Sequence, residues 1–137
     1  METKKENTFK YRQLQSCKCF QSRKNARIMT QFYDKKLKPT KIKITQFTIL
    51  SLIAIGERRT VNSLSEDLFM ERTTLTRSLN ILLKLKLIQK IKNKDGRKKI
   101  VCLTEKGYEL LETAIPLWKE AEEQIFDECK KFGFSAL

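Results

Sequence analysis

Residues 72–104 read RTTLTRSLNILLKLKLIQKIKNKDGRKKIVCLT, and this stretch decides the fold class. Its first half carries Leu75, Leu79 and Leu82. Spacings of three and four residues place these leucines on one face of an amphipathic helix, which we expect over residues 72–86. The other face is polar and basic, so the helix has one side for a core and one side for solvent.

Two β-prone runs follow this helix, at residues 88–92 and 99–103. Residues 93–96 join them with the letters NKDG, and Asp and Gly tolerate the positive φ that a tight hairpin turn needs. A helix that leads directly into a basic two-stranded ribbon is the form of a winged helix-turn-helix. The sequence therefore predicts a mainly α chain with a small β-hairpin wing.

Further helices are predicted before this stretch. A long first helix is expected over residues 9–36, which lack Gly and Pro. Thr45 has the residue type of an N-cap for a second helix that ends at Gly56, and Thr60 opens a third. The expected buried positions of the second and third helices are Phe47, Leu50, Ile53, Val61, Leu64 and Leu68.

A long last helix is predicted after residues 72–104. Thr104 is the expected N-cap, and residue 131 is the expected end. Pro116 lacks the backbone N–H that the helix ladder needs, so we expect a kink or a break there. The chain then forms one continuous structural domain of three parts, namely residues 1–44 with the first helix, 45–103 with the winged helix-turn-helix lobe and 104–137 with the C-terminal helix.

The charge of the chain is uneven, with a net value of +13. Residues 1–44 hold 13 Lys and Arg against 3 acidic residues, and residues 45–103 hold 12 against 5. Residues 104–137 reverse this balance, with 4 against 8. A basic body with an acidic C-terminal element fits a protein that binds a polyanion such as double-stranded DNA. A Lys-rich surface without such a partner is the plainer interpretation.

Enzymatic chemistry has little support in this sequence. The chain has no histidine, which excludes His-based acid–base catalysis and mixed Cys/His zinc sites. Cys17 and Cys19 would point about 200° apart on a helix, so they could not grip one metal ion together. The sequence shows no nucleophile–base pair and no phosphate-cradling Gly-rich loop. We therefore expect neither an enzyme nor a bound cofactor or metal.

No membrane segment is expected either. The longest apolar runs are a few residues, far below the roughly 20 residues of a membrane span. The N-terminal METKKENTFKYR has no apolar stretch typical of a secretory signal. The sequence therefore predicts a cytoplasmic protein.

Side chains suited to DNA crowd the first turns of the helix over 72–86, at Arg72, Thr73, Thr74, Thr76 and Arg77. In a helix-turn-helix these turns of the second helix face the base edges. Short hydroxyls approach bases or phosphates closely, and an arginine can fork onto a guanine. The alternative is that the threonines only cap the helix and the arginines are solvated.

The predicted ribbon tip is basic as well. It carries Lys94, Arg97 and Lys98, with Asp95 among them. A basic tip can enter the narrow, electronegative minor groove, where Asp95 would orient Arg97 through a bidentate pair. The alternative is an ordinary charged hairpin turn.

Several motifs together resemble one known family. They are TQF-x-IL at 45–50, V-x-x-L-x-x-x-L at 61–68, RTTLTR at 72–77, DGR at 95–97 and LT-x-x-G at 103–107. In order and spacing these motifs are similar to the MarR family of bacterial transcription regulators, over nearly the whole of residues 14–126. The resemblance implies a homodimeric winged helix-turn-helix protein that binds a pseudo-palindromic operator, usually as a repressor.

The resemblance also implies roles for single residues. Those that would lie on the recognition helix are Thr73, Thr74, Thr76 and Arg77. Arg97 would belong to the minor-groove wing, and Ser63 would contact a phosphate. Family members generally close the dimer with a further C-terminal helix, whereas this sequence ends at Leu137. The residues then expected to carry dimerisation are Phe20, Leu111, Trp118, Ile125 and Phe126.

Two kinds of signal that would release DNA are compatible with the sequence. Cys19 and Tyr33 are similar to a cysteine and a tyrosine of the peroxide-sensing branch of the family, in which the cysteine is oxidised. Ile44 stands where that branch has a second tyrosine, and a buried Cys19 that acts as a small hydrophobe is the plainer interpretation. The other signal is a small aromatic or lipophilic effector, bound between the dimerisation and DNA-binding parts.

The sequence thus favours a dimeric, sequence-specific DNA-binding transcription regulator. The alternative from another class is a winged-helix protein-interaction module, whose wing and adjoining helices dock another protein. Replacement of Arg97 by Ala separates the two, because only the regulator would lose DNA affinity.

Overall fold

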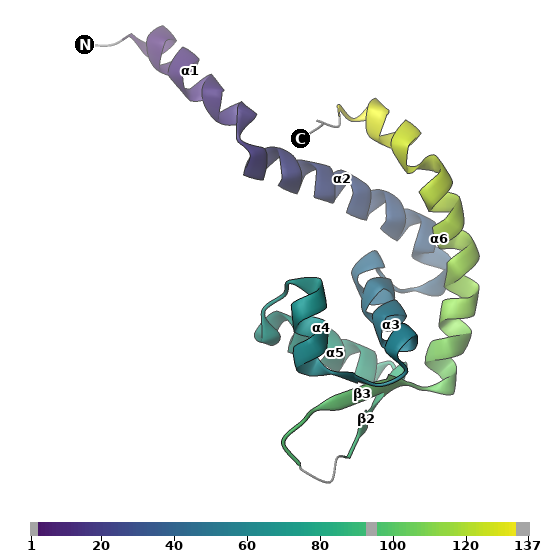
Figure 1. Cartoon of the computed structure of the whole chain (residues 1–137). Coiled ribbons are helices and arrows are strands. Elements are labelled where there is room, and N and C mark those ends of the chain that lie inside the picture. Colours follow the sequence, from purple (N-terminus) through teal and green to yellow (C-terminus); the bar gives the residue numbers. More distant parts are fainter. Residues whose placement is uncertain (1–2, 93–95, 134–137) are drawn as a thin grey trace.

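The computed structural model describes residues 3–92 and 96–133. In chain order the elements are α1 (Lys4–Arg12), the 3-10 turn η1 (Gln13–Ser16), α2 (Lys18–Leu37), the 3-10 turn η2 (Lys38–Thr40), α3 (Ile44–Gly56), β1 (Arg59–Thr60), α4 (Val61–Leu68), α5 (Arg72–Lys84), β2 (Ile88–Ile91), β3 (Ile100–Leu103) and α6 (Glu105–Lys131). Figure 1 shows a lobe of α3, α4, α5 and the sheet below α2, with α6 running along one side. The chain is mainly α with a small sheet, as the sequence predicts.

Threonine side chains mark where two helices begin. The Thr60 hydroxyl oxygen accepts a hydrogen bond from the Ser63 N–H at 3.1 Å, at the start of α4. Thr104 caps α6 in the same way, through the Gly107 N–H at 3.1 Å. These bonds satisfy backbone donors that have no partner inside the first turn of a helix. Both N-caps are those that the sequence predicts.

The start of α3 differs from the prediction. Thr45 is not its N-cap, because the helix begins at Ile44. The Ile44 N–H donates to the Asp34 carboxylate at 2.7 Å, and the Lys43 N–H donates to the Gln46 side-chain oxygen at 2.9 Å. Asp34 belongs to α2, so this boundary depends in part on a contact between two helices.

The two predicted wing strands pair, and a third strand joins them. β2 and β3 are antiparallel, with Ile88 opposite Leu103. β1 pairs with the other edge of β3, where Arg59 lies opposite Val101. The sequence does not predict β1, because two residues are too few to show a periodic pattern. Residues 93–95 of the predicted turn lie outside the described residues.

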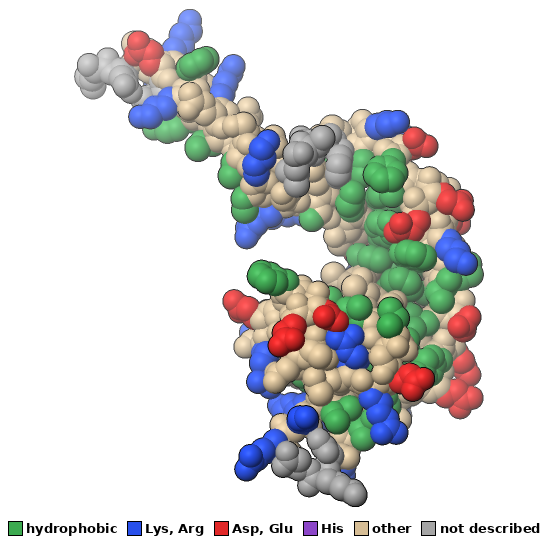
Figure 2. Space-filling model, in the orientation of Figure 1, with side chains coloured by type: hydrophobic (Ala, Val, Ile, Leu, Met, Phe, Trp, Pro, Cys, Tyr) green, Lys and Arg blue, Asp and Glu red, His purple; other side chains and the backbone are tan. Residues whose placement is uncertain are grey.

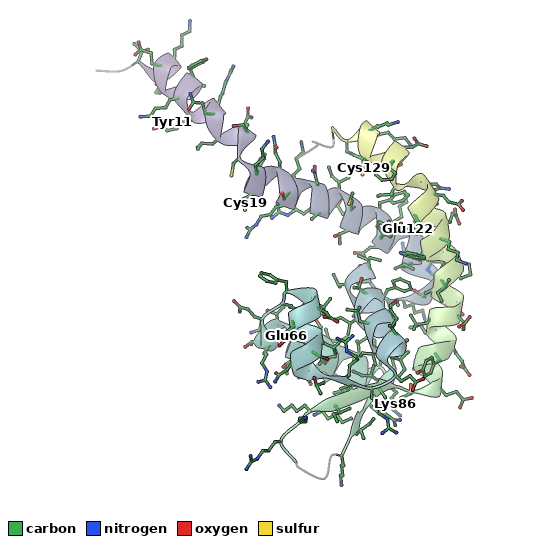
Figure 3. The ribbon with its side chains drawn as sticks, in the orientation of Figure 1. Tyr11, Cys19, Glu66, Lys86, Glu122 and Cys129 are labelled. Atoms are coloured by element: carbon green, nitrogen blue, oxygen red, sulfur yellow. The ribbon has the colours of Figure 1, made fainter. Side chains whose placement is uncertain are left out.

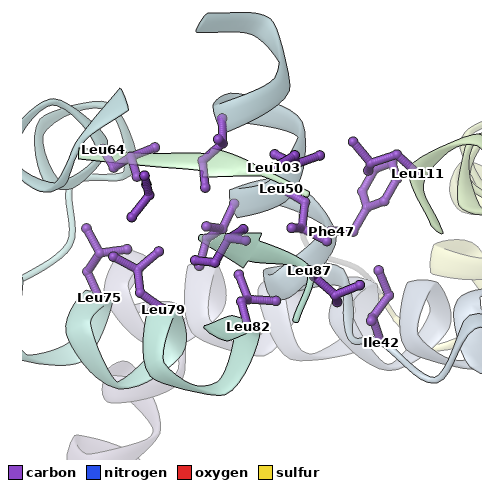
Figure 4. Close-up of a cluster of buried hydrophobic side chains, with 14 of the residues drawn as sticks. Ile42, Phe47, Leu50, Leu64, Leu75, Leu79, Leu82, Leu87, Leu103 and Leu111 are labelled. Atoms are coloured by element: carbon purple, nitrogen blue, oxygen red, sulfur yellow. The ribbon is translucent and has the colours of Figure 1, made fainter. Parts of the chain in front are cut away.

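The lobe is built around one hydrophobic core, shown in Figure 4. Leu75, Leu79 and Leu82 line the inner face of α5 and are at most 4% exposed. The predicted positions of α3 and α4 that are buried in the same core are Phe47, Leu50, Ile53, Val61 and Leu64, and Leu68 is half-buried at its edge. Each fully buried leucine contributes about 1.5–3 kcal/mol, so this stripe fixes which face of α5 turns outward.

The predicted single helix over residues 9–36 is wrong. The chain forms α1, η1 and α2 instead, and Cys17 is extended between η1 and α2, with φ −57° and ψ 121°. The Ser16 hydroxyl donates to the Gln13 carbonyl at 2.7 Å, a local bond that competes with the helix ladder. Every described side chain from residue 3 to residue 20 is exposed, so packing does not hold the segment in one helix.

α6 lies beside α2 and links it to the lobe. The sequence predicts a kink or a break at Pro116, and the break does not occur, because α6 is uninterrupted from Glu105 to Lys131. Figure 1 shows α6 as a curved helix. Two polar contacts join the helices. The Lys36 ammonium lies 2.8 Å from the Glu120 carboxylate, and the Tyr33 hydroxyl donates to Glu122 at 2.5 Å. The exposed Lys36–Glu120 pair lowers the pKa of Glu120.

Candidate nucleic-acid interface

The outer face of α5 carries the polar residues of the predicted recognition helix. Those that the structure leaves exposed there are Arg72, Thr73, Thr74, Thr76 and Arg77. The buried leucine stripe occupies the opposite face of the same helix. The fold therefore presents two arginines and three hydroxyl groups on one exposed helical surface.

The wing adds further positive charge to this end of the lobe. Arg97, Lys98 and Lys99 precede β3 and are exposed. Figure 2 shows Lys and Arg side chains gathered at the wing end of the lobe, whereas acidic side chains follow the length of α6. Lys94 and Asp95, which the sequence assigns to the ribbon tip, lie outside the described residues.

A polar hollow joins α5 to the wing. Its volume is about 180 Å³, and its lining residues are Thr60, Val61, Asn62, Arg72, Arg97, Lys98 and Lys99. The Val61 N–H donates to the Lys99 carbonyl at 3.0 Å, which holds the start of α4 against the wing. Arg72 and Arg97 are distant in sequence but line one hollow, so α5 and the wing form a continuous surface.

Ser63, the predicted phosphate contact, is engaged elsewhere. Its hydroxyl donates to the Thr60 carbonyl and accepts from the Arg59 side chain, both at 3.0 Å. The single O–H donor of Ser63 is therefore already engaged within the chain. Its exposed neighbour Asn62 lines the hollow instead. Sequence reasoning missed Asn62, because only the packing of α4 against the wing decides which side chain faces the hollow.

Arg59 of β1 connects the elements behind this surface. Its guanidinium has three acceptors, which are the Ser63 hydroxyl at 3.0 Å, the Leu52 carbonyl at 3.3 Å and the Asp67 carboxylate at 2.5 Å. Gly56 leaves room for this side chain, since a Cβ at Gly56 would lie 2.5 Å from the Arg59 Cδ. Arg59 therefore links α3, β1 and α4, although no sequence motif singles it out.

The predicted sensor pair is not brought together within one chain. Cys19 and Tyr33 both belong to α2, and their 14-residue separation corresponds to about 21 Å along a helix. Figure 3 labels Cys19 near the start of α2 and Glu122, the partner of Tyr33, near its other end. Burial and then this hydrogen bond raise the pKa of the Tyr33 hydroxyl. Cys19 is exposed, so within the single chain it is not a buried hydrophobe.

The residues predicted for dimerisation fall into two groups. Leu111 and Ile125 are only 6% and 4% exposed, because they pack inside the chain itself. Trp118 is half-buried and stacks on an α3 phenylalanine, with ring centroids 6.1 Å apart. Phe20 and Phe126 stay 51% and 72% exposed. These two side chains therefore keep most of the surface that a second chain could cover.

The described residues form neither a metal site nor a membrane span. Across 3–92 and 96–133, no group of three or more Cys, Asp or Glu residues could hold a metal ion. Over the same ranges no helix is long and apolar enough to cross a membrane. The chemistry that these residues do offer is a cationic, hydroxyl-bearing surface.

Comparison with known proteins identifies the family. Residues 31–114 match the family described as Transcriptional regulator SarA/Rot. The chain belongs to the SarA/Rot family of transcriptional regulators. This SarA/Rot regulator is also 32% identical over 113 residues to the organic hydroperoxide resistance transcriptional regulator of Bacillus subtilis, with 82% of this chain and 77% of that protein covered. These two matches confirm the prediction that the chain is a MarR-type transcription regulator rather than an enzyme.

Solved structures share the winged helix-turn-helix of this SarA/Rot regulator. The M. tuberculosis regulator MosR in complex with DNA has a TM-score of 0.76 and 34% identity, over 80% of each chain. A mutant MarR from E. coli complexed with operator DNA has a TM-score of 0.71 and 23% identity, over 80% of this chain and 77% of that one. Overoxidized AbfR bound to DNA has a TM-score of 0.70 and 25% identity, over 95% and 96%. The predicted fold class is confirmed.

Proposed function

We propose that this SarA/Rot regulator binds a pseudo-palindromic DNA operator as a homodimer and represses transcription until a signal releases it. One observation carries the proposal. The polar face of α5 and the cationic wing form one surface, joined by the hollow that Arg72 and Arg97 line. The MosR, MarR and AbfR structures contain DNA, which supports the same partner for this chain.

α5 has the dimensions and the side chains of a major-groove reader. A helix with its side chains is about 10–12 Å wide, and the major groove is about 12 Å wide. Arg77 can fork onto O6 and N7 of a guanine, and threonine methyl groups can contact thymine. Arg97 on the wing then reaches the adjacent minor groove, whose narrow A·T-rich form attracts arginine. In this arrangement α5 reads bases and the wing fixes its position.

A second copy of the chain would cover an exposed apolar surface. α1 and η1 project away from the rest of the chain (Figure 1). The exposed aromatic and leucine side chains of this segment, of the start of α2 and of the end of α6 are Phe9, Tyr11, Leu14, Phe20, Phe126 and Phe132. Single exposed apolar residues are ordinary, but six on these segments favour an interface. Two copies would place their α5 helices in half-sites about 34 Å apart.

Oxidation of Cys19 is the first proposed signal. The thiol is exposed near the start of α2, and accessible cysteines are those that peroxides can reach. Tyr33 of the same chain lies too far along the helix to hold it, so a contacting tyrosine would come from the second copy. The Bacillus subtilis relative is named an organic hydroperoxide resistance regulator, which favours this signal.

A small aromatic or lipophilic effector is the second proposed signal. A hollow of about 170 Å³ is lined by Ile28, Gln31, Phe32, Lys35, Glu128 and Phe132. Three of these side chains are apolar and three are polar or charged, so the hollow offers a small aromatic molecule both apolar contacts and hydrogen-bonding groups. This hollow lies between α2 and α6, which both belong to the dimerisation part, and not at the boundary with the DNA-binding part where the sequence places the effector. An occupant would alter the angle between these two helices. In a dimer that change would alter the spacing of the two α5 helices. It would therefore lower the fraction of dimers whose spacing allows them to bind DNA.

Selection of bound sites from random duplex DNA tests the proposal. Wild type is expected to enrich an inverted repeat whose half-site centres are about 10 base pairs apart. Arg77→Ala should relax base preference at one position per half-site and weaken binding roughly 5- to 150-fold for each half-site. Lys119→Ala, which removes an exposed cation on α6, should bind as wild type does. An enriched pool that shares no sequence would contradict the proposal.

Two further variants separate the alternatives. Arg97→Ala should weaken DNA binding and make the dependence on salt shallower by about one unit of log–log slope per subunit. A protein-interaction module would show no such change.

Peroxide should release DNA from wild type but not from Cys19→Ser. Equal release from both proteins would remove Cys19 as the sensor and leave the effector as the remaining proposal.

A further inference from the structure

We propose that the hollow between α4, α5 and the wing binds one backbone phosphate of the DNA, on the strand that separates the two grooves. The inference rests on the proposed function, and it assigns a separate task to Asn62, Arg72 and Lys99. These residues would read no base. They would fix the distance between the helix in the major groove and the wing in the minor groove.

The composition of the hollow favours an anion. Four of its seven lining residues are cations, and none is acidic, the lining residues being Thr60, Val61, Asn62, Arg72, Arg97, Lys98 and Lys99. The ion pairs formed within residues 3–92 and 96–133 involve other cations. The positive charge of the hollow is therefore not neutralised by any acid in the part of the chain that the structure describes.

Neutral donors complete the site. Thr60 uses its hydroxyl oxygen to accept the Ser63 N–H, and its own O–H donates to no described residue. The Asn62 amide likewise has no hydrogen-bond partner among the described residues and can donate two N–H bonds. A phosphate oxygen accepts bonds from hydroxyl, amide and guanidinium groups alike. The hollow thus offers both the charge and the neutral donors that a phosphate diester accepts.

The position of the hollow points to DNA rather than to a free ion. If α5 enters a major groove and the wing enters the neighbouring minor groove, one sugar–phosphate strand must cross the surface between them. The hollow occupies that surface, because Arg72 is the first residue of α5 and Lys99 directly precedes β3. A phosphate held there would set the register of the protein on the duplex without any base contact.

The hollow is also held in shape by the backbone. The Val61 N–H donates to the Lys99 carbonyl at 3.0 Å, and Thr60 lies opposite Ile100 in the sheet. These bonds keep the start of α4 and the base of the wing in a fixed relation. A site that is ordered before binding loses less conformational entropy when its ligand arrives, so more of the contact energy with the phosphate contributes to the binding free energy.

A methylphosphonate scan of the selected duplex tests the inference, because each such linkage removes the charge of one phosphate. In wild type, one linkage per half-site should weaken binding roughly 10- to 100-fold. In Arg72→Gln or Lys99→Gln the same linkage should have a clearly smaller effect, since one of the cations that face this phosphate has already been removed. Lys119→Gln on α6 is the matched control and should retain the full loss at that linkage.

Other outcomes overturn the inference separately from the proposed function. If the linkage weakens wild type and the Lys99→Gln protein equally, the hollow does not hold a phosphate, although operator binding stands. If wild type selects no sequence, the proposed function itself fails. The same hollow could instead bind a free phosphate ion, and inorganic phosphate is the probe for that alternative. Stabilisation of the DNA-free protein by millimolar phosphate over chloride at equal ionic strength, lost in Asn62→Ala, would assign the hollow to a free anion.

Discussion

Arg59 of β1 and Asp67 of α4 form an ion pair, with 2.5 Å between the guanidinium and the carboxylate. The arginine side chain is only 15% exposed, whereas the aspartate side chain is 53% exposed. Solvent screens the aspartate, so the pair by itself contributes little. The arginine matters more, because it also donates to Ser63 and to the Leu52 carbonyl. It holds α4 in the orientation that brings Asn62 to the hollow.

Arg59→Ala should therefore cost about 2 kcal/mol of unfolding free energy, since it removes several partly buried hydrogen bonds. Urea unfolding followed by circular dichroism measures the change. Its neighbour Arg58 is exposed, and Arg58→Ala should stay within about 0.5 kcal/mol of wild type. Equal losses in the two variants would show that Arg59 does not connect the three elements.

Gly107 has no room for a side chain. A Cβ there would lie 2.1 Å from the Leu87 carbonyl oxygen, which is backbone and also accepts the Thr104 N–H. Gly107→Ala should therefore destabilise the chain by about 1–3 kcal/mol, because α6 has to move away from Leu87, which directly precedes β2. Glu112→Ala, at an exposed position of the same helix, is the control for a change in helix propensity. A Gly107→Ala protein as stable as this control would contradict the close approach.

Lys86 adopts a left-handed backbone conformation, with φ 59°, directly after α5. Glycine adopts this conformation without steric cost, so Lys86→Gly should stabilise the chain by about 0.5 kcal/mol after the extra unfolded-chain entropy is subtracted. Lys84, two residues earlier, is helical. Lys84→Gly should lose up to about 1 kcal/mol. Thermal unfolding of the two variants should thus shift in opposite directions, and a shared decrease would refute the prediction.

The hydrogen-bonded hydroxyl of Tyr33 should make the stability of the folded chain depend on pH in the alkaline range. Burial and the hydrogen bond to Glu122 raise the pKa of its hydroxyl in the folded state. The folded state then holds the proton more tightly than the unfolded state. The stabilisation is fully present below the unfolded pKa of about 10 and is lost as the pH rises above that value.

Urea unfolding between pH 8 and pH 11 measures this loss. Lysines also titrate in that range, so the informative quantity is the difference between wild type and Tyr33→Phe. That difference should shrink as the pH rises, because the phenylalanine variant has no proton to lose. Tyr108→Phe changes a more exposed tyrosine and serves as the control. A difference that stays constant with pH would mean that the hydrogen bond does not favour the protonated hydroxyl.

The sequence predicted the helix α5 and the pairing of strands β2 and β3 well. The leucine spacing on α5 and the β-prone runs around residues 93–96 are local signals, and local signals depend on residues a few positions apart. Thr60 and Thr104 were predicted as caps for the same reason. The polar face of α5 then followed, because a helix that buries one stripe must expose the opposite one.

Other features could not be predicted in this way. Ser63 was assigned to a phosphate, but its hydroxyl is engaged by Arg59 and Thr60. Leu111 was assigned to dimerisation, but it packs inside the lobe core. The long first helix was expected to be continuous, but every described side chain of the segment that ends at Cys17 is exposed. Each of these outcomes depends on which elements meet, and that information is absent from a local pattern.

By itself, the sequence determined that this chain has an amphipathic helix followed by a cationic hairpin, and hence its fold class. Backbone preference and hydrophobic periodicity are enough for that, because they act between near neighbours in the chain. Only the tertiary structure decided that Arg72 and Lys99 line one hollow and that Arg59 braces α4 behind it. Those residues are separated by many positions, and it is the burial of the shared core that brings them together.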